Sequence, residues 1–208
     1  MISAPEALQR LRDGNRRFVS GGHGHGSDGG RSPAPELSSQ QEPFAIVLGC
    51  SDSRVPAEIV FDQGLGDLFV IRVAGNIVAP SLVGSVEFAA KKLGTRLVVV
   101  LGHTGCGVIS TALQEIERPI EDHSPNLQAI IDRVRPIVEE SVRTGQGLPP
   151  VDLARDAVRR NVEASAEYLR HDSEVLADLI ERDGLMVVCA EYSLDTGEVD
   201  FFGDEGAR

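Results

Sequence analysis

The sequence predicts an α/β protein with a mostly parallel central sheet of about four strands, an antiparallel edge strand and helices on both faces. Four short apolar runs rich in Val and Ile alternate with segments of helical periodicity, at residues 45–48, 68–73, 97–101 and 185–190. The closing stretch EYSLDTGEVDFF indicates a strand, a turn at Asp-Thr-Gly and a returning strand, which supplies the antiparallel edge.

The first element is a helical arm over residues 1–20. Ser3 and Glu6 have the spacing of a capping box, and Pro5 falls in the first turn. Apolar residues then recur near one helical face, while the other face carries four arginines between residues 10 and 17. Such a face is either simply solvated or docks on an acidic surface, for example that of a second subunit.

After the arm, residues 21–40 are rich in Gly, Ser and Pro and predict a flexible loop. Between the apolar runs, helices are expected at 81–93, 108–117, 125–142 and, in two pieces, 151–182. Pro136 is expected to break or kink the third of these helices. No internal repeat or domain boundary is evident, so residues 1–208 are expected to form a single domain.

Composition and charge restrict the class of function. The formal net charge of −12 argues against nucleic acid or an anionic membrane as partner, because both require basic surface. No apolar run is long enough to span a membrane, and the first ten residues lack an apolar signal core. A cytoplasmic protein with a small-molecule ligand is therefore expected. Three cysteines do not make a disulfide framework and indicate metal binding, catalysis or burial.

Two polar clusters follow apolar runs: GCSDSR after the first and GHTGCG after the third. Ligands of open α/β sheets gather beyond the carboxyl ends of strands, so the two clusters could meet there. Cys50, His103 and Cys106 would then offer two thiolates and an imidazole, which suits Zn²⁺ and leaves its fourth position open. Cys106 would begin a helix, whose dipole favours the thiolate. Alternatively, either cysteine is simply a core residue, as we expect for Cys189.

Four motifs together resemble the β-class carbonic anhydrases: CSDSRV, GHTGC at its distance from the first, FVIRVAGN and GSVEFA. The resemblance is close over about residues 41–111. It implies one zinc ion per chain, bound by Cys50, His103 and Cys106, and reversible hydration of CO₂ to bicarbonate and a proton. It also implies a homodimer or homotetramer, with the first helix reaching across to the partner.

The resemblance further assigns catalytic roles to Asp52 and Arg54. The arginine holds the carboxylate, which orients the attacking group toward CO₂; in a closed state Asp52 instead takes the fourth metal position. An ordinary salt bridge at a strand end is the alternative. Five residues are implied in binding the substrate: Gln41, Phe69, Ala74, Phe88 and the backbone of Gly107. Phe69 and Phe88 could equally be core residues.

Two alternatives to CO₂ hydration remain open from the sequence. One is a carbonyl sulfide or carbon disulfide hydrolase on the same fold, and the other is a non-catalytic zinc-binding protein for assembly or sensing. Within the family, one subgroup has a regulatory bicarbonate pocket built with a tryptophan. Val47 stands at that position here and the chain has no tryptophan, although the pocket arginine, Arg72, is present. The chain therefore resembles the plant-like subgroup, and inhibition through a second bicarbonate site is not expected.

Overall fold

A computed structural model describes residues 2–22, 41–118 and 124–203. Its centre is a five-stranded sheet in the order β2-β1-β3-β4-β5. The first four strands in the chain run parallel, and the last is antiparallel to its neighbour, which confirms the predicted class. The strands are β1 (Ala45–Cys50), β2 (Leu68–Val73), β3 (Leu97–His103), β4 (Met186–Tyr192) and β5 (Val199–Phe202).

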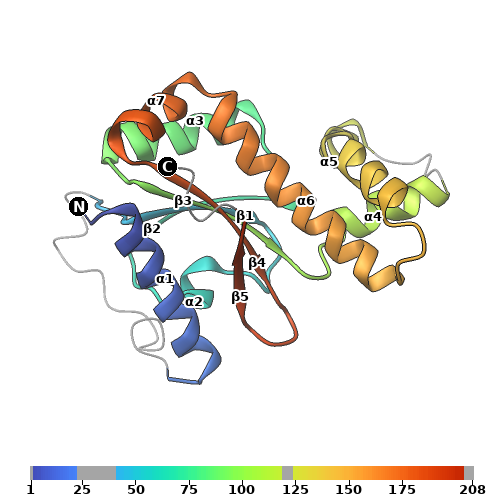
Figure 1. Ribbon diagram of the computed structural model, residues 1–208, viewed down its shortest axis with the longest axis horizontal. Helices are drawn as coiled ribbons and strands as arrows, with labels where there is room; N and C mark the ends of the chain where they lie inside the picture. Colours follow the sequence, from blue (N-terminus) through green and yellow to red (C-terminus); the bar gives the residue numbers. More distant parts are fainter. Residues whose placement is uncertain (1, 23–40, 119–123, 204–208) are drawn as a thin grey trace.

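Helices cover both faces of this sheet. Figure 1 shows α1 (Ala4–Val19) and α2 (Ala57–Val60) on the lower side. On the upper side lie α3 (Pro80–Phe88), its continuation η3 (Ala89–Leu93), α6 (Pro150–His171) and α7 (Glu174–Asp183). The side chains of β1 and β3 alternate between the two cores, because successive residues of a strand point to opposite faces. These strands are apolar at nearly every position because both faces are covered.

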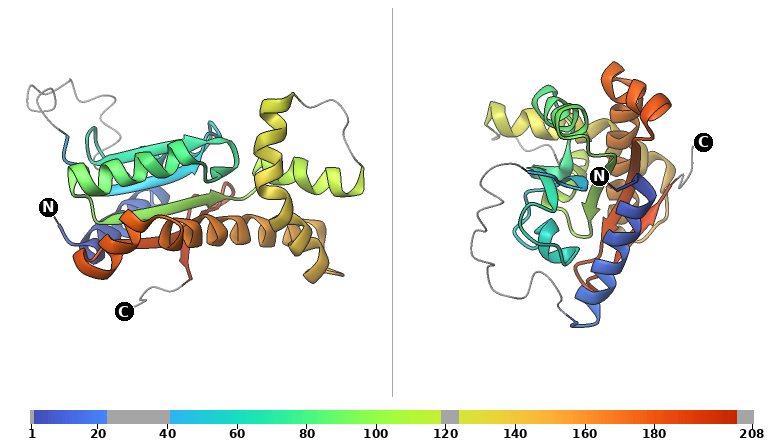
Figure 2. Two further views of the ribbon diagram at one scale, coloured as in Figure 1. Left: turned by 90° about the horizontal axis from the view of Figure 1, so that it is seen from above. Right: turned by 90° about the vertical axis from the view of Figure 1, so that its left-hand side faces the viewer.

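A third layer closes the end of the sheet at which the parallel strands finish. It consists of α4 (Gly107–Glu117) and α5 (Pro125–Thr144), which lie beyond the sheet in the view from above (Figure 2). Pro136 lies inside α5 without ending the helix, so the expected break is not seen there. This layer packs around Cys50 and Cys106, together with the short turn η2 (Ala74–Asn76) that follows β2.

The N-terminal helix α1 is docked on its own chain. Its capping box is present, and its apolar face packs into the core beneath the sheet. Two arginines of the other face bind carboxylates of the same chain, Arg10 with Asp67 at 2.8 Å and Arg17 with Asp62 at 2.6 Å. These two arginines therefore contact carboxylates of their own chain, and the reach of the arm to a second subunit stays a prediction.

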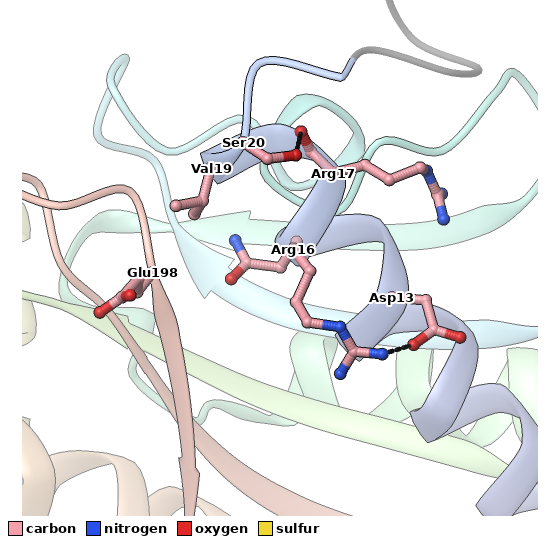
Figure 3. A pocket seen from close by; sticks show the side chains of 7 residues that line it. Asp13, Arg16, Arg17, Val19, Ser20 and Glu198 are labelled. Carbon is pink, nitrogen blue, oxygen red and sulfur yellow. Dashed lines mark hydrogen bonds and ion pairs between the residues drawn. The ribbon is translucent and has the colours of Figure 1, made fainter.

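Asn15 attaches α1 to the edge strand. Its amide donates to the backbone oxygens of Val60 and Gly197 and accepts from the backbone N–H of Val199. Beside it lies an open groove of about 730 Å³, between the end of α1 and the turn that precedes β5 (Figure 3). Arg16 in this groove is paired with Asp13. The groove thus lies along the contact between α1 and the segment that leads into β5.

Residues 23–40 of the predicted loop lie outside the described residues, so the flexibility expected for residues 21–40 stays a prediction. Within the described part of the chain, no helix is long and apolar enough to cross a membrane.

Candidate metal centre

The cluster at the carboxyl edge of the sheet follows from strand order. β1 and β3 are hydrogen-bonded parallel neighbours, with Gly49 opposite Leu101, so the two strands finish side by side. Cys50 is the last residue of β1, His103 the last of β3, and Cys106 directly precedes α4. One ligand atom from each of these three residues lies within 4.8 Å of the other two, and all three residues are buried. The structure therefore brings together the three predicted zinc ligands.

The orientation of His103 fits a metal ion. Its Nδ1 lies 2.9 Å from the backbone oxygen of Thr104, which as an acceptor places the ring proton on Nδ1. The lone pair is then on Nε2, which is buried and has no hydrogen-bond partner within the described residues. A buried nitrogen without a partner is costly, and a cation next to the two thiols would satisfy it. The donor set of two sulfurs and one imidazole suits Zn²⁺.

The two thiols are electrostatically coupled. The Cys106 thiol, and to a smaller extent the neighbouring His103 ring and the Gly75 N–H at 3.3 Å, lower the pKa of Cys50 well below its ordinary value. The same thiol–thiol bond, together with burial, raises the pKa of Cys106. Backbone N–H groups at the start of α4 act on Cys106 in the opposite direction, as the helix position predicts. One thiolate therefore forms readily, and the second requires a cation beside it.

Asp52 and Arg54 form the predicted pair at the rim of the cluster. The Arg54 side chain donates to both carboxylate oxygens of Asp52, at 2.9 and 2.7 Å, and the Arg54 N–H donates at 2.9 Å. These bonds hold the pKa of Asp52 well below its ordinary value. The Oδ2 atom of Asp52 lies 3.9 Å from Nε2 of His103, so the carboxylate faces the metal position without entering it.

Arg72 acts on the backbone of the ligand-bearing segment. It donates from Nε to the Cys50 oxygen at 2.9 Å and from Nη2 to the Asp52 oxygen at 2.5 Å. From the sequence, this arginine is either an anion-binding residue or a member of a structural ion pair, and the bonds seen here are instead to backbone oxygens. Val47 stands where the subgroup with a bicarbonate pocket is expected to have a tryptophan. It is fully buried in the core on the α1 side of the sheet. Arg72 thus fixes the loop that carries Cys50 and Asp52.

The five expected substrate-binding residues do not all lie near the cluster. Ala74 and Gly107 do, since each is next in sequence to a residue that contacts or supplies a ligand. Phe69, however, lies opposite Ile46, whereas Val73 lies opposite Cys50. Four residues of strand separate Phe69 from the cluster edge, about 13 Å at 3.3 Å per residue.

The other two substrate residues belong with Phe69 rather than with the metal ligands. The rings of Phe69 and Phe88 are 6.3 Å apart, and Phe88 is 49% exposed. Gln41 is exposed and precedes β1, at the amino end of the sheet. Within one chain, the structure therefore separates Gln41, Phe69 and Phe88 from the cluster.

Two features of the centre were missed in the sequence. One is the backbone N–H of Gly75, and the other is the carbonyl of Thr104 that orients His103. A signal for the first was present, because a glycine between the end of a strand and an asparagine indicates a tight turn. Gly75 has φ +74°, and a Cβ there would lie 2.9 Å from Val108. No such signal marks Thr104.

The fold is α/β, and the cluster at its carboxyl edge is a candidate metal site whose ligand set suits a catalytic zinc ion. The family model described as carbonic anhydrase matches residues 45–199, and the chain belongs to the β-class carbonic anhydrases.

Two mycobacterial relatives match over nearly the whole chain. Carbonic anhydrase 2 of Mycobacterium tuberculosis is 37% identical over 96% of this chain and 95% of its own length. The carbonic anhydrase of Mycolicibacterium smegmatis is 38% identical over the same shares. Among solved structures, the β-carbonic anhydrase CafA of Aspergillus fumigatus is 26% identical, with a TM-score of 0.73 over 81% of this chain and 79% of that one.

Proposed function

We propose that this enzyme catalyses the zinc-dependent, reversible hydration of CO₂ to bicarbonate and a proton. The observation that carries the proposal is the buried cluster with its unpartnered His103 nitrogen, beside the ionised Asp52. Cys50, His103 and Cys106 would hold one zinc ion per chain. A zinc ion with three protein ligands lowers the pKa of a bound water to about 7 and so supplies a nucleophile at neutral pH.

The protein's own residues then orient that nucleophile. Asp52 would accept a hydrogen bond from the nucleophile and so orient it toward CO₂, while Arg54 keeps the carboxylate ionised and in place. Ala74 and the Gly107 N–H lie on the same side as the ligands and would border the CO₂ position. In a closed state, Asp52 would leave Arg54 and would itself be a ligand of the metal. The two metal-binding thiols must stay reduced, which favours a cytoplasmic location.

Stopped-flow CO₂ hydration by the zinc-loaded protein tests this function, with carbonyl sulfide as a parallel substrate. We expect hydration well above the buffer rate and little release of hydrogen sulfide from carbonyl sulfide. Faster turnover of carbonyl sulfide would identify the hydrolase alternative. Bound zinc without turnover of either substrate would identify a non-catalytic zinc protein.

We also propose that the active unit is a homodimer or homotetramer in which Gln41, Phe69 and Phe88 complete the partner's site. The rings of Phe69 and Phe88 are in contact, Phe69 lies toward the amino end of its strand, and Gln41 precedes β1, so all three lie away from the carboxyl edge that carries the cluster. An exposed phenylalanine next to a second aromatic ring is also the kind of surface that subunit interfaces bury.

Mixing two defective variants tests this arrangement. Cys106→Ala lacks a metal ligand but keeps Phe88, whereas Phe88→Ala keeps the metal ligands. If Phe88 acts on the partner's site, mixed dimers hold one intact site, and an equal mixture after subunit exchange should recover roughly a quarter of wild-type activity. Each variant alone is the control. A mixture no more active than the average of its parts, with mixed dimers present by native mass spectrometry, contradicts the proposal.

A further inference from the structure

Cys50, a proposed zinc ligand, accepts a hydrogen bond from the turn η2, and η2 in turn accepts hydrogen bonds from α6. The turn η2 presents the Gly75 N–H to Sγ of Cys50 at 3.3 Å. Gly75 has φ +74° and Asn76 has φ +42°, so two consecutive residues have left-handed backbone conformations. For the asparagine this conformation is uncommon, although asparagine adopts it more readily than most other residues.

Two buried side chains of α6 donate hydrogen bonds to the carbonyl oxygens of this turn. Asn161 donates from Nδ2 to the Gly75 oxygen at 2.9 Å, and Ser165 donates from Oγ to the Asn76 oxygen at 3.3 Å. They are four residues apart and therefore share one helical face. Asn161 is 2% exposed and its bond to the Gly75 oxygen is buried, so without the Asn161 amide that oxygen would lose this hydrogen-bond partner in a buried position. From the other side, Val108 of α4 closes against Gly75.

The Gly75 N–H and the Gly75 oxygen belong to different peptide groups, joined only through the two free dihedral angles of a glycine. Glycine restricts these two angles least of all residues, so the N–H keeps one direction only if the turn is held from outside. The Asn161 bond to the Gly75 oxygen holds one of the two peptide groups. We infer that Asn161 is a positioning residue for the metal centre: through the Gly75 backbone it orients the hydrogen bond that directs Cys50 toward zinc. This inference rests on the proposed zinc-dependent function. It adds an outer-shell residue that is far in sequence from the metal ligands and from Gly75.

Because outer-shell partners orient ligands, their loss typically costs ten- to a hundredfold in metal affinity. The test compares Asn161→Leu with Asn15→Leu, each removing a buried asparagine amide that bonds backbone oxygens, the second at α1 away from the cluster. Both should lower the midpoint of thermal unfolding. Only Asn161→Leu should weaken zinc binding, by about tenfold or more in chelator competition. Only it should shift the thiolate-to-cobalt absorption band of the cobalt-substituted protein.

Asn161→Ala provides a second variant without added bulk, should the leucine prevent folding. Wild-type zinc affinity and an unchanged cobalt spectrum in a folded Asn161 variant would overturn the inference and leave Asn161 a purely structural residue. Equal losses of zinc affinity in the Asn15 variant would overturn it as well. A wild-type protein that binds zinc but fails to hydrate CO₂ would overturn the proposed function alone, because the affinity comparison needs no turnover.

Discussion

Replacing Cys106 by alanine is expected to remove zinc and CO₂ hydration together. The substitution leaves two ligands, Cys50 and His103, where a catalytic zinc site needs three. It also removes the hydrogen bond that lowers the pKa of Cys50, so the remaining thiol gives up its proton less readily. Since outer-shell changes already cost up to a hundredfold, the loss of a direct ligand should cost more than about a hundredfold in zinc affinity.

Metal analysis after dialysis and stopped-flow hydration measure the two effects on the same sample. Cys189→Ala is the matched control, because Cys189 is also a buried free cysteine but lies in the core between the sheet and α6. It should keep both zinc and activity. Full zinc content in Cys106→Ala would contradict the assignment of this ligand, whatever the rate.

The meeting of Cys50 with His103 could be predicted because two general rules apply to it. Apolar runs that alternate with helices form parallel strands, and parallel strands place their carboxyl ends at one edge. Each cluster directly follows its run, so little loop geometry had to be known. The contact of Arg54 with Asp52 could be predicted as readily, since the two residues are only two positions apart.

The same rule of strand direction could have separated Phe69 from the metal ligands. Phe69 is the second residue of its run, at the amino end, whereas Cys50 follows the carboxyl end of the neighbouring run. The contact of Asn161 with Gly75 could not have been predicted in this way. It joins residues 86 apart and depends on how α6 packs over a strained turn, which no local pattern encodes.

Asp52→Asn should reduce CO₂ hydration about a hundredfold while leaving zinc bound, because positioning of the nucleophile is lost and no ligand is removed. In the protein, both oxygens of Asp52 accept hydrogen bonds from Arg54, and Oδ2 faces the cluster. An amide offers one acceptor oxygen, so it can satisfy Arg54 or the nucleophile but not both. Arg54 also holds the pKa of Asp52 below its ordinary value, so the carboxylate stays ionised at neutral and alkaline pH. The variant should therefore show a deficit throughout that range.

Measuring kcat/KM between pH 7 and pH 9, with zinc content at each point, separates this orienting role from a purely structural one. Asp67→Asn is the matched control, because Asp67 also pairs with an arginine, Arg10, at 2.8 Å but lies away from the cluster. It should change stability slightly and the rate not at all.

A closed state in which Asp52 is a metal ligand predicts a second result in the same measurements. A carboxylate competes for the fourth zinc position best at low pH, where hydroxide is scarce, so wild-type activity should rise with pH more steeply than that of Asp52→Asn. A variant with the wild-type rate and the wild-type pH profile would exclude both roles, and Asp52 would then serve only to anchor Arg54 at the end of β1.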